Sequence, residues 1–400
     1  MGIIQTDQFE NLKVYHYQDG TTDKSLLDIR GIIKATEMVN DELVEKVVCK
    51  SFGYTPEVLV NDFENLNALI SPMVTYDTKF FKAYEGTILR VWNYNGKWFL
   101  STHRKINASQ SKWGHSINYG RLFDMALEAA SLTEKSFDDY VKLLEPNKVY
   151  VFLLRTFQAN RKVCTALEHP TLYCIGSFNR EKDFAFEINN PEACLPSPEQ
   201  LTDIETPEQL IAHVNTMNYL EYQGVVLLNP DGTSGKLVNV EYDALDKLRG
   251  NEPNVLYRYV QLRWDAPRAA QFRKLYPEHE PSFDKWERVM DHVVRNILRK
   301  YIERFINRRT AILPPEQYPM LQKLQDLYHQ VLKPQKQRVG LEHIWDLLGK
   351  MPEKEVNVMY KKYVEREKES GNGNRLPEGV RDSIIKHIRG GEKANPEGEK

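Results

Sequence analysis

The sequence predicts an α+β fold, in which a region of antiparallel sheets is followed by a region made only of helices. Between about Met73 and Gly250, short apolar and aromatic runs alternate with turn sequences such as Pro230-Asp231-Gly232, which is typical of antiparallel hairpins. After about residue 255, the apolar residues recur with the period of a helix. Because the two patterns are separate along the chain, we expect two successive structural regions.

The strand region divides into an N-terminal part, residues 1–72, and a core, residues 73–255. The stretch Lys79–Lys105 predicts two strands joined by a hairpin turn at Asn93–Gly96. Within the same core, the stretches 121–132 and 206–218 have the spacing of amphipathic helices.

The helical region, residues 256–370, is predicted from one long amphipathic stretch that begins with Ser282 as a capping residue. Further helices are expected near residues 320–331, 341–348 and 353–367. The last segment, residues 371–400, is rich in Gly, Glu and Lys, so we expect a loosely held tail with a short helix near residues 380–388. The apolar stripe of the long helix comprises Phe283, Trp286, Val289, Met290, Val293, Ile297, Tyr301 and Phe305.

The composition bounds the class of protein. Of the 400 residues, 41% are hydrophobic and 28% are charged, which is typical of a folded globular protein rather than a disordered one. The net charge is −2, so a nucleic-acid site must be a local basic patch. Because no apolar run is long enough for a membrane span and the first twenty residues are polar and acidic, we expect neither a membrane span nor a secretion signal. The four cysteines lack metal-ligand spacing, so we expect reduced thiols in a cytoplasmic protein without a membrane partner.

Several short motifs follow one another in the strand region. The first is Arg30-Gly31, and the second is Glu85-Gly86-Thr87. A basic strand end, Phe99–Lys105, comes next, followed by the apolar strand 149–154 with Asn160-Arg161 behind it. The last motifs are Gln223-Gly224-Val225 and a strand that starts at Lys236.

In this order and spacing, the motifs of residues 25–255 resemble ATP-dependent RNA ligases, in the branch of phage-type tRNA-repair ligases and their giant-virus relatives. The resemblance implies a nucleotidyltransferase fold, ATP and Mg²⁺ as cofactors, and RNA as substrate. It also implies that a lysine attacks the α-phosphorus of ATP to give a lysyl-AMP intermediate. The nucleotide-binding residues that the resemblance implies are Arg30, Glu85, Arg104, Lys105, Gln223 and Lys236.

The chain departs from this family at the catalytic side chains. Ala83 stands where the family has its nucleophilic lysine, and Lys82, one residue earlier, is the candidate nucleophile. Because side chains alternate across a strand, Lys82 reaches the face of position 83 only through a bulge or a turn. Otherwise Lys82 is a solvated lysine at a strand edge.

The other catalytic positions hold uncharged residues as well. Leu153 and Gln223 occupy positions where the family has glutamates, and Val238 occupies that of a second lysine. Loss of these charges removes most of the electrostatic stabilisation that phosphoryl transfer needs. Glu221 lies two residues before Gln223, and we name it as a candidate metal ligand in place of the lost carboxylate.

The long helix adds a local basic patch. Between residues 295 and 309 only Glu303 opposes the cations, so the stretch predicts contacts with an RNA backbone, with a solvated helix face as the alternative. The candidate RNA-binding residues are Arg295, Arg299, Lys300, Arg304, Arg308 and Arg309.

Three hypotheses for function follow. The first is an RNA-ligase-like protein that binds a nucleotide and RNA ends and seals strands through lysyl-AMP. The second is an inactive pseudo-ligase that serves as an RNA-binding or assembly module. The third is an RNA guanylyltransferase, which shares the fold but uses GTP; a helical region in place of a second β-barrel counts against it.

Overall fold

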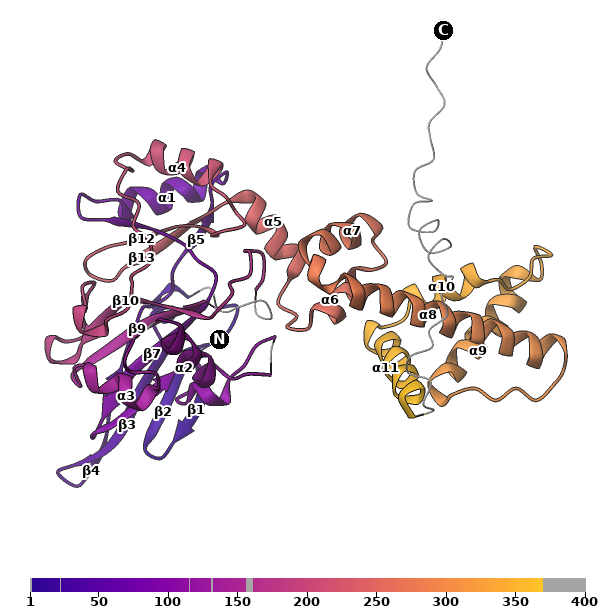
Figure 1. Ribbon diagram of the computed structural model, residues 1–400, viewed down its shortest axis with the longest axis horizontal. Coiled ribbons are helices and arrows are strands. Elements are labelled where there is room, and N and C mark those ends of the chain that lie inside the picture. The colour runs from indigo at the N-terminus through magenta and orange to yellow at the C-terminus, as the bar shows by residue number, and fades with distance from the viewer. Residues whose placement is uncertain (1, 22, 115, 131, 156–160, 370–400) are drawn as a thin grey trace, which may run out of the picture. The chain divides into compact units, whose positions relative to one another are not determined.

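The computed structural model describes residues 2–21, 23–114, 116–130, 132–155 and 161–369. It divides into two compact units, Met1–Pro253 and Asn254–Lys400, of which the first holds sheets and the second holds helices (Figure 1). The predicted tail, its short helix near residues 380–388 and the motif residue Asn160 lie outside the described residues.

The first unit begins with a four-stranded antiparallel sheet. Its strands, in spatial and chain order, are β1 (Ile3–Phe9), β2 (Leu12–Tyr17), β3 (Arg30–Val39) and β4 (Glu42–Cys49). Alternate residues of β2 and β3, such as Val14 and Ile33, are fully buried against Trp92 of the next sheet. This face is therefore part of the core between the first two sheets.

A second, five-stranded sheet packs against the first one. Its spatial order is β11 (Ala185–Glu187), β10 (Thr171–Asn179), β9 (Lys148–Arg155), β7 (Thr87–Tyr94) and β8 (Lys97–Ser101). The helices α2 (Tyr119–Ala129) and α3 (Phe137–Tyr140) cover its other face. Because both faces are covered, seven of the eight residues of β9 are buried.

The third sheet carries much of the candidate site. Its order is β5 (Glu57–Leu59), β13 (Ser234–Val238), β12 (Gly224–Leu228) and β6 (Lys79–Lys82). The β5–β13 pair is parallel and the other pairs are antiparallel. The helices α1 (Phe63–Met73) and α4 (Pro207–Thr216) pack on one face, and α5 (Val240–Arg249) follows β13.

The prediction of two strands between Lys79 and Lys105 is corrected by the structure, which has three. β6 joins the third sheet, whereas β7 and β8 form a hairpin in the second sheet. Asn95 and Gly96 turn this hairpin with φ angles of 51° and 80°, the left-handed conformation that a two-residue turn requires. The apolar pattern does not reveal that β6 and β7 belong to different sheets, because both of these strands carry buried apolar residues.

The described residues of the second unit form helices joined by loops, without a strand. Its α-helices are α6 (Val255–Leu262), α7 (Ala266–Leu275), α8 (Glu280–Tyr301), α9 (Tyr318–Leu327), α10 (Leu341–Gly349) and α11 (Glu353–Glu369). π-Helical turns at Ile302–Ile306 and Tyr328–Leu332 extend α8 and α9. The short 3₁₀ segments of the two units are Lys24–Leu26, Ala108–Gln110, Val141–Leu143, Arg180–Lys182, Pro191–Ala193, Pro277–His279 and Pro315–Gln317.

The long helix α8 is organised by the predicted apolar stripe. From Phe283 to Tyr301 all members of the stripe are buried, and Phe305 is half-buried. The helix begins at Glu280 and not at Ser282, because Pro281 in its first turn has no backbone N–H that would need an acceptor. The predicted α+β class, with a helical C-terminal region, is confirmed.

Candidate nucleotide site

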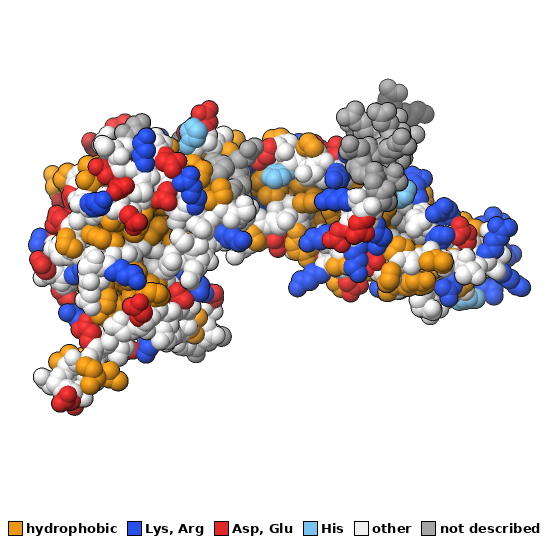
Figure 2. Space-filling model, turned by 60° about the horizontal axis from the view of Figure 1, so that its bottom comes forward, with side chains coloured by type: hydrophobic (Ala, Val, Ile, Leu, Met, Phe, Trp, Pro, Cys, Tyr) orange, Lys and Arg blue, Asp and Glu red, His pale blue; other side chains and the backbone are white. Residues whose placement is uncertain are grey.

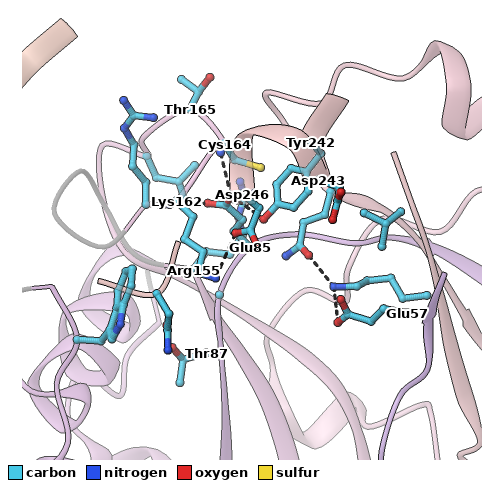
Figure 3. A pocket seen from close by; sticks show the side chains of 18 of the residues that line it. Glu57, Glu85, Thr87, Arg155, Lys162, Cys164, Thr165, Tyr242, Asp243 and Asp246 are labelled. Atoms are coloured by element: carbon cyan, nitrogen blue, oxygen red, sulfur yellow. Dashed lines mark hydrogen bonds and ion pairs between the residues drawn. The ribbon is translucent and has the colours of Figure 1, made fainter. Parts of the chain in front are cut away.

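Two adjoining cavities lie between the second and third sheets, and four residues belong to the walls of both: Glu57, Gly86, Gln223 and Lys236. We call the first one, of about 260 Å³, the apolar cavity. Its wall holds Ala83, Leu153, Ile88, Ile175, Ile188, Phe81, Val226 and Leu228, with Arg30 also part of the wall. The second one, of about 440 Å³, is the polar cavity, whose charged and aromatic side chains Figure 3 shows.

Ala83, the residue that directly follows strand β6, lines the apolar cavity, whereas the ammonium of Lys82 is bound elsewhere. The backbone N–H of Ala83 donates to the carbonyl of Gly224 at 2.9 Å, and its carbonyl accepts from the N–H of Gln223 at 2.7 Å, so two successive residues of the partner segment oppose Ala83 just beyond the β6–β12 pairs. Lys82 contributes to the cavity wall, but its Nζ lies 2.7 Å from a Glu199 carboxylate oxygen and 5.1 Å from the centre of the Tyr222 ring. Its amine is therefore engaged by a carboxylate and an aromatic face.

A short polar chain runs along the wall that the two cavities share. The Gln223 amide donates to the backbone carbonyl of Tyr84 at 3.1 Å and accepts from Lys236 Nζ at 2.7 Å. Lys236 Nζ also lies 2.7 Å from a carboxylate oxygen of Glu57, and its side chain is 13% exposed. The dashed lines of Figure 3 mark part of this chain, which fixes one cation beside both cavities.

Glu85 organises the wall of the polar cavity through its carboxylate. One carboxylate oxygen accepts from the backbone N–H groups of Val163 and Cys164 at 2.7 and 3.0 Å and from the Tyr242 hydroxyl at 2.9 Å. The other oxygen accepts from the backbone N–H of Lys162 at 3.0 Å. Burial, with the Glu85 charge beside it, raises the pKa of Tyr242, which keeps this hydroxyl a donor. Glu85 thus ties the segment 162–164 and helix α5 to the start of β7.

The polar cavity also contains ion pairs. Lys162 Nζ lies 3.2 Å from Asp246 and Lys247 Nζ lies 2.7 Å from Asp243, both within or next to helix α5. The Arg155 guanidinium stacks 4.2 Å from the centre of the Tyr84 ring. The wall therefore holds cations beside carboxylates rather than a field of one sign.

The residues of the site do not fit the Mg²⁺ ion that the resemblance implies. Leu153 supplies no oxygen, and the Gln223 amide already holds two partners. Among the described residues, no group of three His, Cys, Asp or Glu side chains could hold a metal ion. Glu221 is exposed in the turn before β12, where strand alternation does not apply, and its carboxylate accepts from Asn218 at 2.9 Å.

The other predicted nucleotide-binding residues are distributed over two places. Arg30 is in the wall of the apolar cavity and donates to the carbonyl of Gly53 at 3.2 Å. Arg104 pairs with Asp19, and Lys105 pairs with Asp7 at 3.2 Å. Neither Arg104 nor Lys105 is part of the wall of the two cavities.

Several residues of the site were missed by the sequence reasoning. Lys162 follows the Asn160-Arg161 motif directly, so the motif itself was a signal for it. Glu57 carries no such signal, because it reaches the site only through the parallel pairing of β5 with β13. Tyr242 and Trp113 are single aromatic residues in ordinary contexts, and nothing in the sequence marks them as cavity residues.

In the second unit, the six predicted RNA-binding residues lie on α8 and the turns that follow it. All are exposed except Lys300, which is half-buried and pairs with Glu303 at 2.7 Å. Arg295 pairs with Asp291 at 2.7 Å, and Arg299 donates to the Asn296 side chain at 2.8 Å. These pairs leave a basic stretch at the surface, since exposed ion pairs of this kind are weak.

Comparisons with known proteins agree with the resemblance to viral RNA ligases. The chain is 33% identical over 237 residues to the immediate-early protein ICP-46 homolog of Invertebrate iridescent virus 3, a match that covers 58% of this chain and 51% of that protein. It is 25% identical over 178 residues to the "Putative bifunctional polynucleotide kinase/RNA ligase" of Autographa californica nuclear polyhedrosis virus, covering 44% and 24% of the two chains. The predicted resemblance to RNA ligases with viral relatives is thereby confirmed.

Two further findings set the limits of these similarities. No protein-family model matches the chain. An archaeal ATP-dependent RNA ligase structure matches 69% of this chain and 67% of its own with 11% identity and a TM-score of 0.39, a likeness too loose to establish a relationship. The chain spans about half the length of its iridescent-virus relative and about a quarter of the polynucleotide kinase/RNA ligase.

Two further observations concern membrane-spanning helices and the cysteines. Within the described residues, no helix combines the length and the apolar character that crossing a membrane requires. All four cysteines are free thiols, and three of them are buried.

Proposed function

We propose that this chain is an RNA-ligase-like protein that binds ATP without forming a lysyl-AMP intermediate, and that binds RNA through its second unit. The observation that carries the proposal is the geometry at the end of β6. Ala83 stands in the cavity wall at the nucleophile position, while the Lys82 amine is held by Glu199. A pseudo-ligase of this kind keeps the ligand site and lacks the attacking group.

The two cavities suit the two halves of a nucleotide. The apolar cavity, with its aliphatic wall, offers a base the dry surroundings that flat heterocycles favour. Lys236 and Arg30 belong to that wall, and we assign them to the phosphates, because the third cation of the wall, Lys82, is held by Glu199. Lys162 and Arg155, in the polar cavity, would meet the outer phosphates or the end of an RNA strand.

RNA binding rests on the basic stretch from Arg295 to Arg309. Phosphate contacts depend on local positive charge even when the chain as a whole is nearly neutral, as this one is. The curated relatives are viral proteins, and we place the chain in the cytoplasm of infected cells. Strand sealing through Lys82 is the competing function, and it requires the Lys82–Glu199 pair to break and the strand to rotate.

Titration calorimetry with ATP, combined with intact-mass measurement of the protein after incubation with ATP or GTP and Mg²⁺, tests the proposal. We expect ATP to bind, no mass increase from either nucleotide, at least tenfold weaker binding for Lys236→Ala, and unchanged binding for Lys82→Ala. A wild-type adduct of AMP mass that Lys82→Ala abolishes would establish the ligase alternative. A GMP adduct would establish a guanylyltransferase, and absence of nucleotide binding would overturn the proposal itself.

A further inference from the structure

The hairpin of β3 and β4 extends beyond the sheet to which it belongs. Pairing of β3 with β2 ends at Ala35, whereas β3 continues to pair with β4 up to Val39. Residues 37–45, which we call the ribbon, therefore form a two-stranded segment with neither edge paired. Such hairpins are marginally stable in water when nothing covers them. In Figure 1 the ribbon is the part of the first unit beside the label β4.

The end of the ribbon is apolar on both faces. Met38 and Leu43 are directly opposite each other and are 63% and 72% exposed. Val39 and Val44, which alternate with them on the other face, are 47% and 43% exposed. Figure 2 shows apolar and acidic side chains together on this projection. Four large apolar side chains at one tip are more than solubility favours, so we expect a partner to cover them.

A groove with an aromatic wall, which is suited to this apolar tip, begins near the point where the ribbon leaves its sheet. It has a volume of about 480 Å³, within the range of ligand pockets, and aromatic residues Phe9, Trp98, Phe99 and Phe137 are part of its wall. Its charged side chains are Lys97, Arg121 and Asp124. Lys97 and Arg121 are exposed, whereas Asp124 is half-buried and accepts from the backbone N–H of Phe137.

The ribbon and the groove are complementary in charge and close in the fold. The ribbon carries the acids Glu37, Asp41, Glu42 and Glu45 and no Lys or Arg; Glu45 pairs with Lys34 and Lys13 of its own sheet, so Asp41 and Glu42 are the acids that we assign to the groove. The exposed charges of the groove wall are basic: Lys97 lies over the rings of Phe9 and Phe99, and Arg121 pairs with Glu128 in an exposed and therefore weak ion pair. Tyr94 ends β7 and is opposite Lys97 at the start of β8. The Tyr94 hydroxyl donates to Glu37 at 2.9 Å, which brings the ribbon close to the groove residue Lys97. A ribbon and a groove that lie near each other on the same unit suit reciprocal insertion, because a two-fold axis then satisfies both copies at once.

We infer that this chain forms a two-fold dimer in which the ribbon of each copy inserts its apolar tip into the aromatic groove of the other copy. The inference is independent of the nucleotide site, since none of these residues is part of the walls of the apolar and polar cavities.

Sedimentation velocity of the full-length chain, without nucleotide, tests the inference. We expect a dimer for the wild type and a monomer for the ribbon variant Met38→Ser/Leu43→Ser and for the groove variant Lys97→Glu/Arg121→Glu, with dissociation constants raised at least tenfold. Both variants change exposed side chains, and unchanged circular dichroism would verify their folding. Tyr76→Ser and Lys285→Glu/Lys323→Glu are matched controls at exposed sites elsewhere, and they should remain dimeric.

Mixing the two monomeric variants is the decisive experiment for the pairing of ribbon and groove. The mixture retains one intact ribbon and one intact groove, so a heterodimer should form although neither variant dimerises alone. A monomeric wild type, a dimer that survives both pairs of substitutions, or a mixture that stays monomeric would each overturn the inference.

Discussion

Replacing Glu85 tests whether this carboxylate holds the site together, as its contacts indicate. Glu85→Ala removes the acceptor of three backbone N–H groups and of the Tyr242 hydroxyl. At about 1 kcal/mol for each hydrogen bond, the free energy of unfolding of the first unit should fall by about 4 kcal/mol. Glu85→Gln keeps an amide oxygen for three of the four donors but turns its NH2 group towards the N–H of Lys162, so it should cost about 2 kcal/mol.

Urea unfolding followed by tryptophan fluorescence measures the decrease in the free energy of unfolding for both variants. Hydrogen exchange shows where the structure is weakened, since the amides of residues 162–164 should exchange much faster in Glu85→Ala than in Glu85→Gln. ATP affinity should fall in parallel, because Lys162 belongs to the released segment. If Glu85→Ala were as stable as the wild type and these amides stayed protected, Glu85 would not anchor the wall.

Three other predictions concern catalysis, acid stability and RNA. Ala83→Lys alone should give no AMP adduct by intact mass, because Leu153 and Gln223 still lack the charge that phosphoryl transfer needs; rapid adduct formation would contradict this. The Lys182 hydrogen bond lowers the pKa of Glu187 from 4.5 to about 2, so the stabilisation is full above pH 4.5 and is lost as the pH falls towards 2. Glu187→Gln should therefore be less stable than the wild type at pH 7 and equal to it near pH 2 by urea titration; an equal deficit at both pH values would refute this. The last variant replaces three exposed arginines by glutamine: Arg295, Arg299 and Arg304. It should bind RNA more weakly in filter assays and flatten the salt slope by about two to three; an unchanged slope would indicate a merely solvated face.

The strand periodicity predicted the local structure of the site better than its assembly. Alternation of side chains correctly separates the Lys82 amine from Ala83, because a regular strand leaves no other arrangement. The same periodicity gives no information about which strands become neighbours, so the division of Lys79–Lys105 between two sheets was missed. In the helical unit the stripe from Phe283 to Tyr301 was predictable, since a single helix period determines which face is buried.

The residues of the site also differ in this way: some lie in local sequence motifs, and others are placed by pairing between distant strands. Gln223 and Lys236 were found because they lie within motifs whose spacing is local. Glu57 was not found, since it belongs to a three-residue strand that contacts the site through pairing with a distant part of the chain. Glu85 was found for nucleotide binding, whereas the structure shows its carboxylate bonded to the backbone of residues 162–164.

The dual character of the Gln223 amide has a consequence for how this site can change. An amide donates and accepts at once, so Gln223 joins the Tyr84 carbonyl to the Lys236 ammonium. A glutamate at this position would keep the pairing with Lys236 but turn a second acceptor towards the Tyr84 carbonyl, where a hydrogen bond becomes a repulsion. A single substitution to the glutamate of RNA ligases thus meets an environment that favours an amide. Under the proposed function, ligase activity in this chain would require several coordinated substitutions, because the first of them alone is disfavoured.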